Sequence, residues 1–78
     1  SEHSYGRAID INPIQNPYVL DGTVLPAAGV PYADRSRNEQ GMIHAVGPVI
    51  RSFAAIGWSW GGNWQSPTDY QHFSATGR

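Results

Sequence analysis

The feature that most constrains how this chain can fold is the complete absence of cysteine from its 78 residues. A domain of this length buries a modest fraction of its surface, so its core alone gives marginal stability. Small folds usually gain further stability from disulfides or from a bound metal. Without cysteine, disulfides, thiolate zinc sites, iron–sulfur clusters and cysteine nucleophiles are excluded. A metal held by histidine and carboxylate side chains remains compatible with the sequence.

The charged residues are few and nearly balanced, which limits the classes of partner. The formal net charge is −1, and all five basic residues are arginines. Nucleic acids and anionic membranes both require a basic patch, so neither is an expected partner. No apolar run approaches the roughly 20 residues of a membrane-spanning helix. The length predicts one domain over residues 1–78, and we expect a monomer.

Histidines and carboxylates lie close together near both ends of the chain. His3 precedes Asp10 by seven residues, and Asp69 precedes His72 by three. Two histidines and one carboxylate form a typical catalytic zinc site, in which the fourth position stays open for water. The pattern therefore predicts a zinc site made of His3, Asp10 and His72. Asp69 lies where a general base would be useful, which points to a peptidase.

Two segments predict strands of one small sheet. Residues 5–12 alternate with period two, which predicts a strand with Ile9 and Ile11 on its core face and Asp10 on its other face. A ligand upstream of this strand reaches the same metal only if the chain bends, and Gly6 permits the bend. A last short strand is predicted over residues 70–74.

Residues 13–38 predict a long and mostly irregular connection, because prolines and glycines interrupt it repeatedly. Asp21 and Gly22 are a strong turn signal. A loop this long in a small domain is often functional, as a binding loop or the rim of a site. A solvated connector that carries no function is an equally good interpretation.

Residues 42–56 predict the one helix. An apolar stripe recurs there at helical spacing, formed by Ile43, Val46, Ile50, Phe53 and Ile56. Pro48 must either kink this helix or mark its true start, and Gly57 ends it. His44 has no carboxylate or histidine at ligand spacing, so we assign it a structural place on the helix face.

All three tryptophans fall within residues 58–64, around a pair of glycines that predicts a turn. Trp58 and Trp60 alternate as in a short strand. In so small a domain at least one tryptophan is expected to anchor the core. We assign Trp58 to the core, and we place Trp60 and Trp64 beside the metal site as substrate-binding residues.

The motifs S-x-H-x-x-G-x-A-x-D-I at one end and W-G-G-x-W with D-x-x-H-F at the other carry a resemblance. They resemble the M15 family of zinc D-Ala-D-Ala carboxypeptidases and related peptidoglycan endopeptidases, in its VanY-like branch. The resemblance covers nearly the whole chain. That family's domain is longer at its N-terminal end, so we expect this chain to be the C-terminal catalytic part of a truncated domain.

The resemblance implies a role for each matching residue. His3, Asp10 and His72 would ligate zinc, and Asp69 would be the catalytic carboxylate, where much of the family has glutamate. Ser1 matches the motif serine and would contact the substrate backbone. The family also has an arginine that stabilises the reacting carbonyl, and its position lies before Ser1.

The expected fold is α+β, with an antiparallel sheet from residues 5–12, 58–61 and 70–74 and a helix over 43–56 on one face. The resemblance implies the same architecture, the Hedgehog/DD-peptidase fold. The expected function is hydrolysis of peptidoglycan stem peptides with Zn2+ as cofactor. The protein would then act in the cell wall or periplasm, or be a phage-encoded lysin.

Three alternatives stay open. The enzyme is either a D-Ala-D-Ala carboxypeptidase or an L-Ala-D-Glu endopeptidase of the endolysin type. A non-catalytic, zinc-stabilised binding module of the same fold is the second alternative. The third is an unrelated small binding domain whose histidines and aspartates are solvated surface residues that bind no metal.

Overall fold

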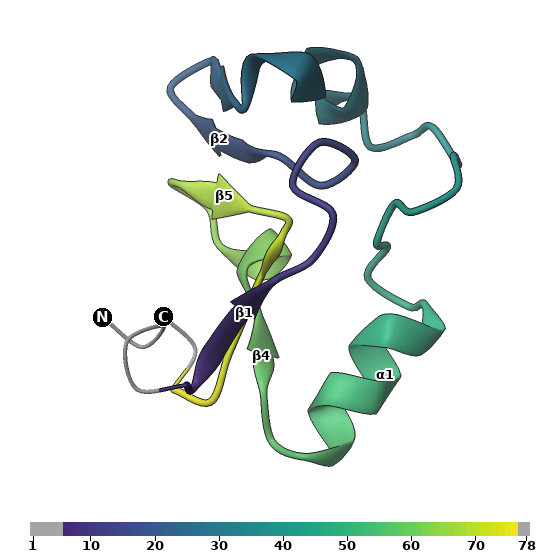
Figure 1. The fold of residues 1–78 in the computed structure, drawn as a ribbon, viewed down its shortest axis with the longest axis vertical. Helices are drawn as coiled ribbons and strands as arrows, with labels where there is room; N and C mark the ends of the chain where they lie inside the picture. Colours follow the sequence, from purple (N-terminus) through teal and green to yellow (C-terminus); the bar gives the residue numbers. More distant parts are fainter. Residues whose placement is uncertain (1–5, 77–78) are drawn as a thin grey trace.

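The computed structural model describes residues 6–76, which form an α+β fold with two three-stranded antiparallel sheets and one α-helix (Figure 1). The first sheet contains β1 (Ala8–Asp10), β6 (His72–Ser74) and β4 (Ser59–Trp60), in the order β1-β6-β4. These strands lie within the three predicted segments. The α+β prediction is therefore confirmed, with strands shorter than expected.

The second sheet was not predicted. It contains β3 (Thr23–Leu25), β2 (Tyr18–Leu20) and β5 (Thr68–Asp69), in the order β3-β2-β5. The predicted turn at Asp21 and Gly22 joins β2 to β3, and both turn residues have positive φ, as two-residue hairpins require. The 3-10 helix η2 (Ala27–Ala33) follows. Residues 13–38 are therefore less irregular than the prolines and glycines suggested.

The helix α1 (Pro48–Ala55) begins six residues later than predicted. Pro48 occupies the first helical turn, where its missing N–H costs no hydrogen bond, so it marks the start of the helix. Gly57 follows the helix with φ +81°, a conformation that favours glycine. His44 precedes the helix, in a turn where the Gly47 N–H donates to the His44 carbonyl at 2.9 Å. The predicted place of His44 on the helix face is wrong.

The hydrophobic core lies between the first sheet and α1. Its buried members are Ile43, Trp60 and Phe73, and the rings of Phe53 and Phe73 stack at 4.3 Å. Trp58 packs against the core, as expected, but the expected place of Trp60 beside the metal site is wrong. Trp60 is 6% exposed in the core, whereas Trp58 is only partly buried against it.

The predicted core face of β1 is the one next to the core residue Phe73, because Ile9 lies directly opposite Phe73 in β6. Ala8 is buried, and Ile9 is 39% exposed. Ala8 lies opposite the buried Ser74 of β6 on the other face, so burial along β1 does not follow the core face alone. Ile11 does pack against the core. The strand ends at Asp10, so the period-two alternation does not extend to Ile11.

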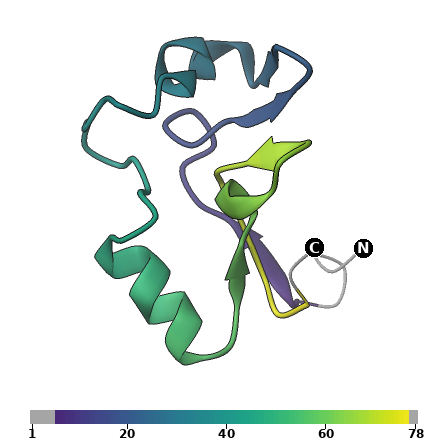
Figure 2. The same cartoon turned by 180° about the vertical axis from the view of Figure 1, so that it is seen from behind.

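The elements are arranged along one long axis. The β2–β3 hairpin and η2 lie at one end, α1 lies at the other, and residues 34–47 connect them along one side (Figures 1 and 2). The two sheets meet between these ends, where β5 turns into β6. Within residues 6–76, none of the helices has the length and apolar character needed to cross a bilayer.

Candidate metal centre

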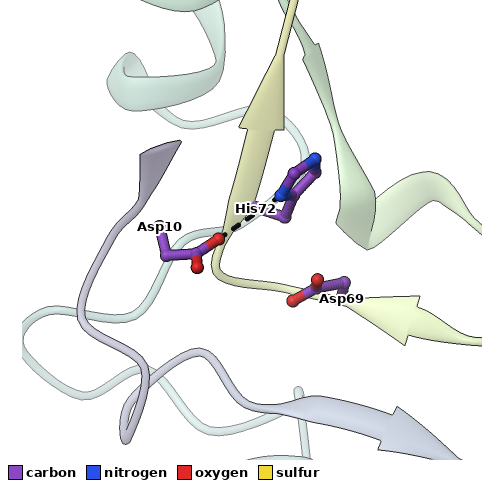
Figure 3. Close-up of side chains that lie close together, drawn as sticks. All are labelled: Asp10, Asp69 and His72. Carbon is purple, nitrogen blue, oxygen red and sulfur yellow. Dashed lines mark hydrogen bonds and ion pairs between the residues drawn. The ribbon is translucent and has the colours of Figure 1, made fainter. Parts of the chain in front are cut away.

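Three side chains converge where the two sheets meet. Asp10 is the last residue of β1, Asp69 is the last residue of β5, and His72 is the first residue of β6. One potential ligand atom from each lies within 4.8 Å of the other two (Figure 3). The site therefore combines residues from both ends of the sequence in one group that could hold a single ion.

The pairing of β1 with β6 sets the geometry of the first two residues. Asp10 and His72 are direct cross-strand partners, and His72 Nδ1 lies 3.3 Å from Asp10 Oδ1. A charge-assisted hydrogen bond is usually shorter, about 2.7–2.9 Å. Two atoms that each lie about 2.0–2.1 Å from a tetrahedral zinc ion are roughly 3.3 Å apart. The separation of Asp10 and His72 therefore fits two ligands of one zinc ion.

The site is closed on one side and open on the other. The side chain of His72 is 7% exposed and that of Asp10 is 36% exposed. The half-buried Trp64 lies beside the imidazole, with its ring centroid 5.2 Å from that of His72. A ligand would approach past Asp10, with the indole of Trp64 near the buried histidine.

The β5–β6 turn (Tyr70 and Gln71) determines how far Asp69 lies from His72, and several parts of the chain hold it. The Tyr70 N–H donates to the Pro17 carbonyl at 3.1 Å, and the Tyr70 carbonyl accepts from the Trp60 indole at 2.8 Å. The Gln71 carbonyl accepts from the Ile11 N–H at 2.8 Å. The turn is thus fixed from both sheets.

Gly61 allows Asp69 to occupy its place. A Cβ at Gly61 would lie 2.5 Å from the Asp69 carbonyl oxygen, so a side chain there would displace the strand that carries Asp69. Sequence reasoning assigned Gly61 and Gly62 only a turn. The sole signal was a glycine pair after a strand, which fits an ordinary turn equally well.

The other predicted site residues differ in their positions. Ser1 and His3 lie outside the described residues, so their roles stay predictions. Trp64 lies near His72, and its substrate-binding role stays a prediction. The Trp60 ring is in the core and its N–H donates to the Tyr70 carbonyl, so the ring is not available to a substrate.

A small α+β domain that gathers two carboxylates and an imidazole has the donor set of a candidate metal-dependent hydrolase. Residues 1–75 match the family model described as D-alanyl-D-alanine carboxypeptidase. The chain therefore belongs to this M15 family of peptidases. No curated protein and no solved structure matches the chain significantly. The VanY-like branch and the Hedgehog/DD-peptidase architecture stay predictions.

Proposed function

We propose that the chain is a zinc-dependent metallopeptidase that hydrolyses peptidoglycan stem peptides, of the D-Ala-D-Ala carboxypeptidase type. The observation that carries this proposal is the convergence of Asp10, Asp69 and His72 within 4.8 Å in a chain of this peptidase family. Asp10 and His72 would hold zinc together with His3. Asp69 would transfer protons between the attacking water and the leaving amine.

A bound zinc ion would supply an acidified water molecule and a Lewis acid for the peptide carbonyl. The chain itself supplies the proton transfers. The Asp69 carboxylate would accept a proton from the attacking water and then deliver it to the leaving amine. Hydrogen bonds from both sheets hold the β5–β6 turn, so this carboxylate stays close to Asp10 and His72 without large rearrangement.

The surroundings of the site support a peptide substrate with small side chains. The side chain of Asp10 is 36% exposed, so a substrate in solution would reach the site from this side. The indole of Trp64 offers an apolar surface beside His72 for a methyl group such as that of D-alanine. A protein that cleaves stem peptides would act outside the cytoplasm, in the cell wall or periplasm, or as a phage-encoded lysin.

Two alternatives remain, and one observation favours the second of them. An L-Ala-D-Glu endopeptidase would use the same residues with a groove open at both ends. A zinc-stabilised binding module would use Asp69 as a further ligand, and the Asp69 carboxylate is close enough to Asp10 and His72 for that role. The two roles of Asp69 predict different behaviour when the carboxylate is replaced.

The test combines cleavage and zinc affinity. The chain is incubated with zinc and either a D-Ala-D-Ala-terminated stem pentapeptide or a muropeptide containing L-Ala-D-Glu, and the products are identified by mass spectrometry. We expect release of D-alanine. We also expect Asp69→Asn to lose about 10²–10⁴-fold in rate while it retains zinc. The matched control is Asp34→Asn, because the exposed Asp34 carboxylate accepts its hydrogen bonds from Ser36 in its own turn.

Each other result points to a different function. Cleavage between L-Ala and D-Glu would identify the endopeptidase. Bound zinc without cleavage, together with weaker zinc binding by Asp69→Asn, would identify the binding module. No bound zinc would overturn the proposed function.

A further inference from the structure

Arg35 lies half-buried in the connection after η2, and its guanidinium joins separate parts of the chain. Nη1 donates to the carbonyls of Gln15 at 2.8 Å and Tyr32 at 3.1 Å. Nη2 donates to Asn16 Oδ1 at 3.0 Å and to the Ile43 carbonyl at 2.7 Å. One side chain therefore joins residues 15 and 16 to the core residue Ile43.

Placing a charge there is costly unless its donors are satisfied. Burial lowers the pKa of Arg35 below its ordinary value, against an opposing effect of Tyr70, and an arginine remains charged at neutral pH even so. Four short hydrogen bonds to carbonyl and amide oxygens offset this cost. The guanidinium of Arg35 and its four hydrogen-bonded partners, called the clamp below, are therefore a satisfied internal contact rather than a solvated surface contact.

The clamp reaches the metal centre through the β5–β6 turn. The guanidinium carbon of Arg35 lies 4.2 Å from the centroid of the Tyr70 ring, within the range of a cation–π contact. The Tyr70 N–H donates to Pro17, and Gln71 Nε2 donates to the Asn16 carbonyl at 3.4 Å. Both residues of the turn are thus tied to the segment that Arg35 holds.

We propose that Arg35 is a positioning residue of the metal centre. It clamps residues 15–17 and covers the Tyr70 ring, and so it fixes the turn that sets the spacing of Asp69 and His72. The activity part of this proposal rests on the proposed function. The positioning part concerns the geometry of the centre and is measurable without any cleavage.

The magnitude of the effect follows from how such sites respond to their supports. Groups that orient metal ligands are typically worth about 10–100-fold in metal affinity or activity. The connection carrying Arg35 would then be part of the site's framework. It would be neither a rim that contacts substrate nor a connector without function.

The chain contains a matched control for Arg35. Arg37 also lies over a tyrosine, with its guanidinium carbon 5.3 Å from the Tyr32 ring centroid, and it bonds to Glu39 and to the Pro31 carbonyl. All these partners belong to residues 31–39. Loss of Arg37 therefore removes an aromatic contact and two hydrogen bonds without touching the β5–β6 turn.

The test measures the zinc dissociation constant by competition with a chromophoric chelator, well below the melting temperature. We expect Arg35→Met to raise this constant about 10-fold or more, and Arg37→Met to change it less than about 2-fold. Arg35→Lys should give an intermediate value, because lysine retains the charge but not the forked donors. Tyr70→Leu should reproduce Arg35→Met, and the double variant should be no worse than either alone.

Amide hydrogen exchange in the metal-free chain gives a second readout. We expect Arg35→Met to accelerate exchange at the Tyr70 and Ile11 amides, which hold the turn, relative to Arg37→Met. If Arg35→Met lowers only the melting temperature, and leaves zinc affinity and these amides like those of Arg37→Met, the proposal is wrong. If Arg35→Met fails to fold, Arg35→Lys and Tyr70→Leu decide by the same two readouts.

The failure of this proposal is distinguishable from failure of the proposed function. A chain that binds zinc but cleaves no stem peptide refutes the enzyme, and the affinity ratio still decides whether Arg35 positions the centre. A chain that binds no zinc refutes the proposed metal site, and the exchange rates at Tyr70 and Ile11 decide.

Discussion

Asp10 and His72 are paired residues on neighbouring strands although 62 positions separate them in the sequence. Directly opposed residues of an antiparallel pair have Cβ atoms about 4.5–5.5 Å apart. The backbone pairing of β1 with β6 therefore places the carboxylate next to the imidazole before any metal is bound. A metal that joined them would cross-link two strands in a chain without disulfides.

The first prediction concerns metal removal. Zinc at about 100 times its dissociation constant would stabilise the fold by about 2.7 kcal/mol. For a domain of this size that corresponds to a rise of roughly 10–20 °C in melting temperature. We expect a chelator to abolish this rise in the wild type. Thermal melts with and without chelator, together with elemental analysis, are the measurement.

His72→Ala should remove the response to chelator, because His72 is the buried member of the ligand pair. His44→Ala is the matched control, since His44 lies in the turn before α1 and outside the group of described residues that could hold a metal. It should keep the full response. A wild-type melt that chelator does not change would contradict the metal site.

The sequence was most informative where a pattern is local. Alternation located β1, and the turn residues Asp21 and Gly22 located a hairpin. Pro48 was expected either to kink the helix or to start it, and the structure shows that it starts α1. The D-x-x-H spacing also gave the correct neighbours, because a two-residue turn separates β5 from β6. Each of these signals depends on a few adjacent residues.

The sequence was least informative where the structure depends on distant partners. β2, β3 and β5 were missed because each lies next to a proline or a turn glycine, and these residues predict irregular chain. Asn16 and Arg35 donate to backbone carbonyls up to 25 residues away, which no spacing rule reveals. Trp58 and Trp60 occupy equivalent positions in the predicted alternation. Only the packing of Trp60 with Phe73 in the structure shows which of the two tryptophans is buried.

The second prediction concerns Gly61 and Asp69. Gly61→Ala should cost about 1–3 kcal/mol, because the new methyl group collides with the backbone of β5. We also expect lower peptidase activity, since the collision displaces Asp69. The measurement is a denaturant melt paired with kcat.

Gly57→Ala serves as the comparison. It places alanine at φ +81° with open space around it, at a cost of about 1–2 kcal/mol, and α1 ends there, away from the metal centre. Its activity should equal that of the wild type at a temperature where both are folded. Equal loss of activity in the two variants would show that stability alone explains Gly61.

The third prediction concerns Asn16, which is fully buried. Its Nδ2 donates to Gly41, Asn12 and Ile11, and its Oδ1 accepts from the Ile43 N–H at 2.7 Å. Asn16→Ala leaves these buried backbone groups unpaired, at roughly 1–3 kcal/mol for each group that water does not reach. Urea unfolding should show a large loss of stability.

Asn12→Gly is the control for Asn16, because Asn12 also donates to the Gly41 carbonyl but is exposed, and glycine keeps the backbone at φ +45° without strain. Its substitution should cost well under half as much, since water replaces the lost bond. Similar losses for both variants would argue that burial does not set the cost.

The last prediction concerns Trp64, whose ring lies 5.2 Å from that of His72. Zinc binding changes the electrostatic surroundings of this indole, so we expect a change in tryptophan emission on zinc addition. Trp64→Phe should lose most of that change. Trp58→Phe should keep it, because Trp58 packs against Phe53, away from the metal centre.

Two further tryptophan variants separate a role in substrate binding from a role in packing. Trp64 is only half-buried, so Trp64→Ala should cost little stability but raise KM for a stem peptide about 10-fold, the loss expected when apolar contact with a small side chain is removed. Trp60→Phe should behave in the opposite way. It loses the 2.8 Å bond to the Tyr70 carbonyl and core volume, so the free energy of unfolding falls while KM stays near the wild-type value. An unchanged KM in Trp64→Ala would remove Trp64 from the substrate site and leave it a neighbour of His72 alone.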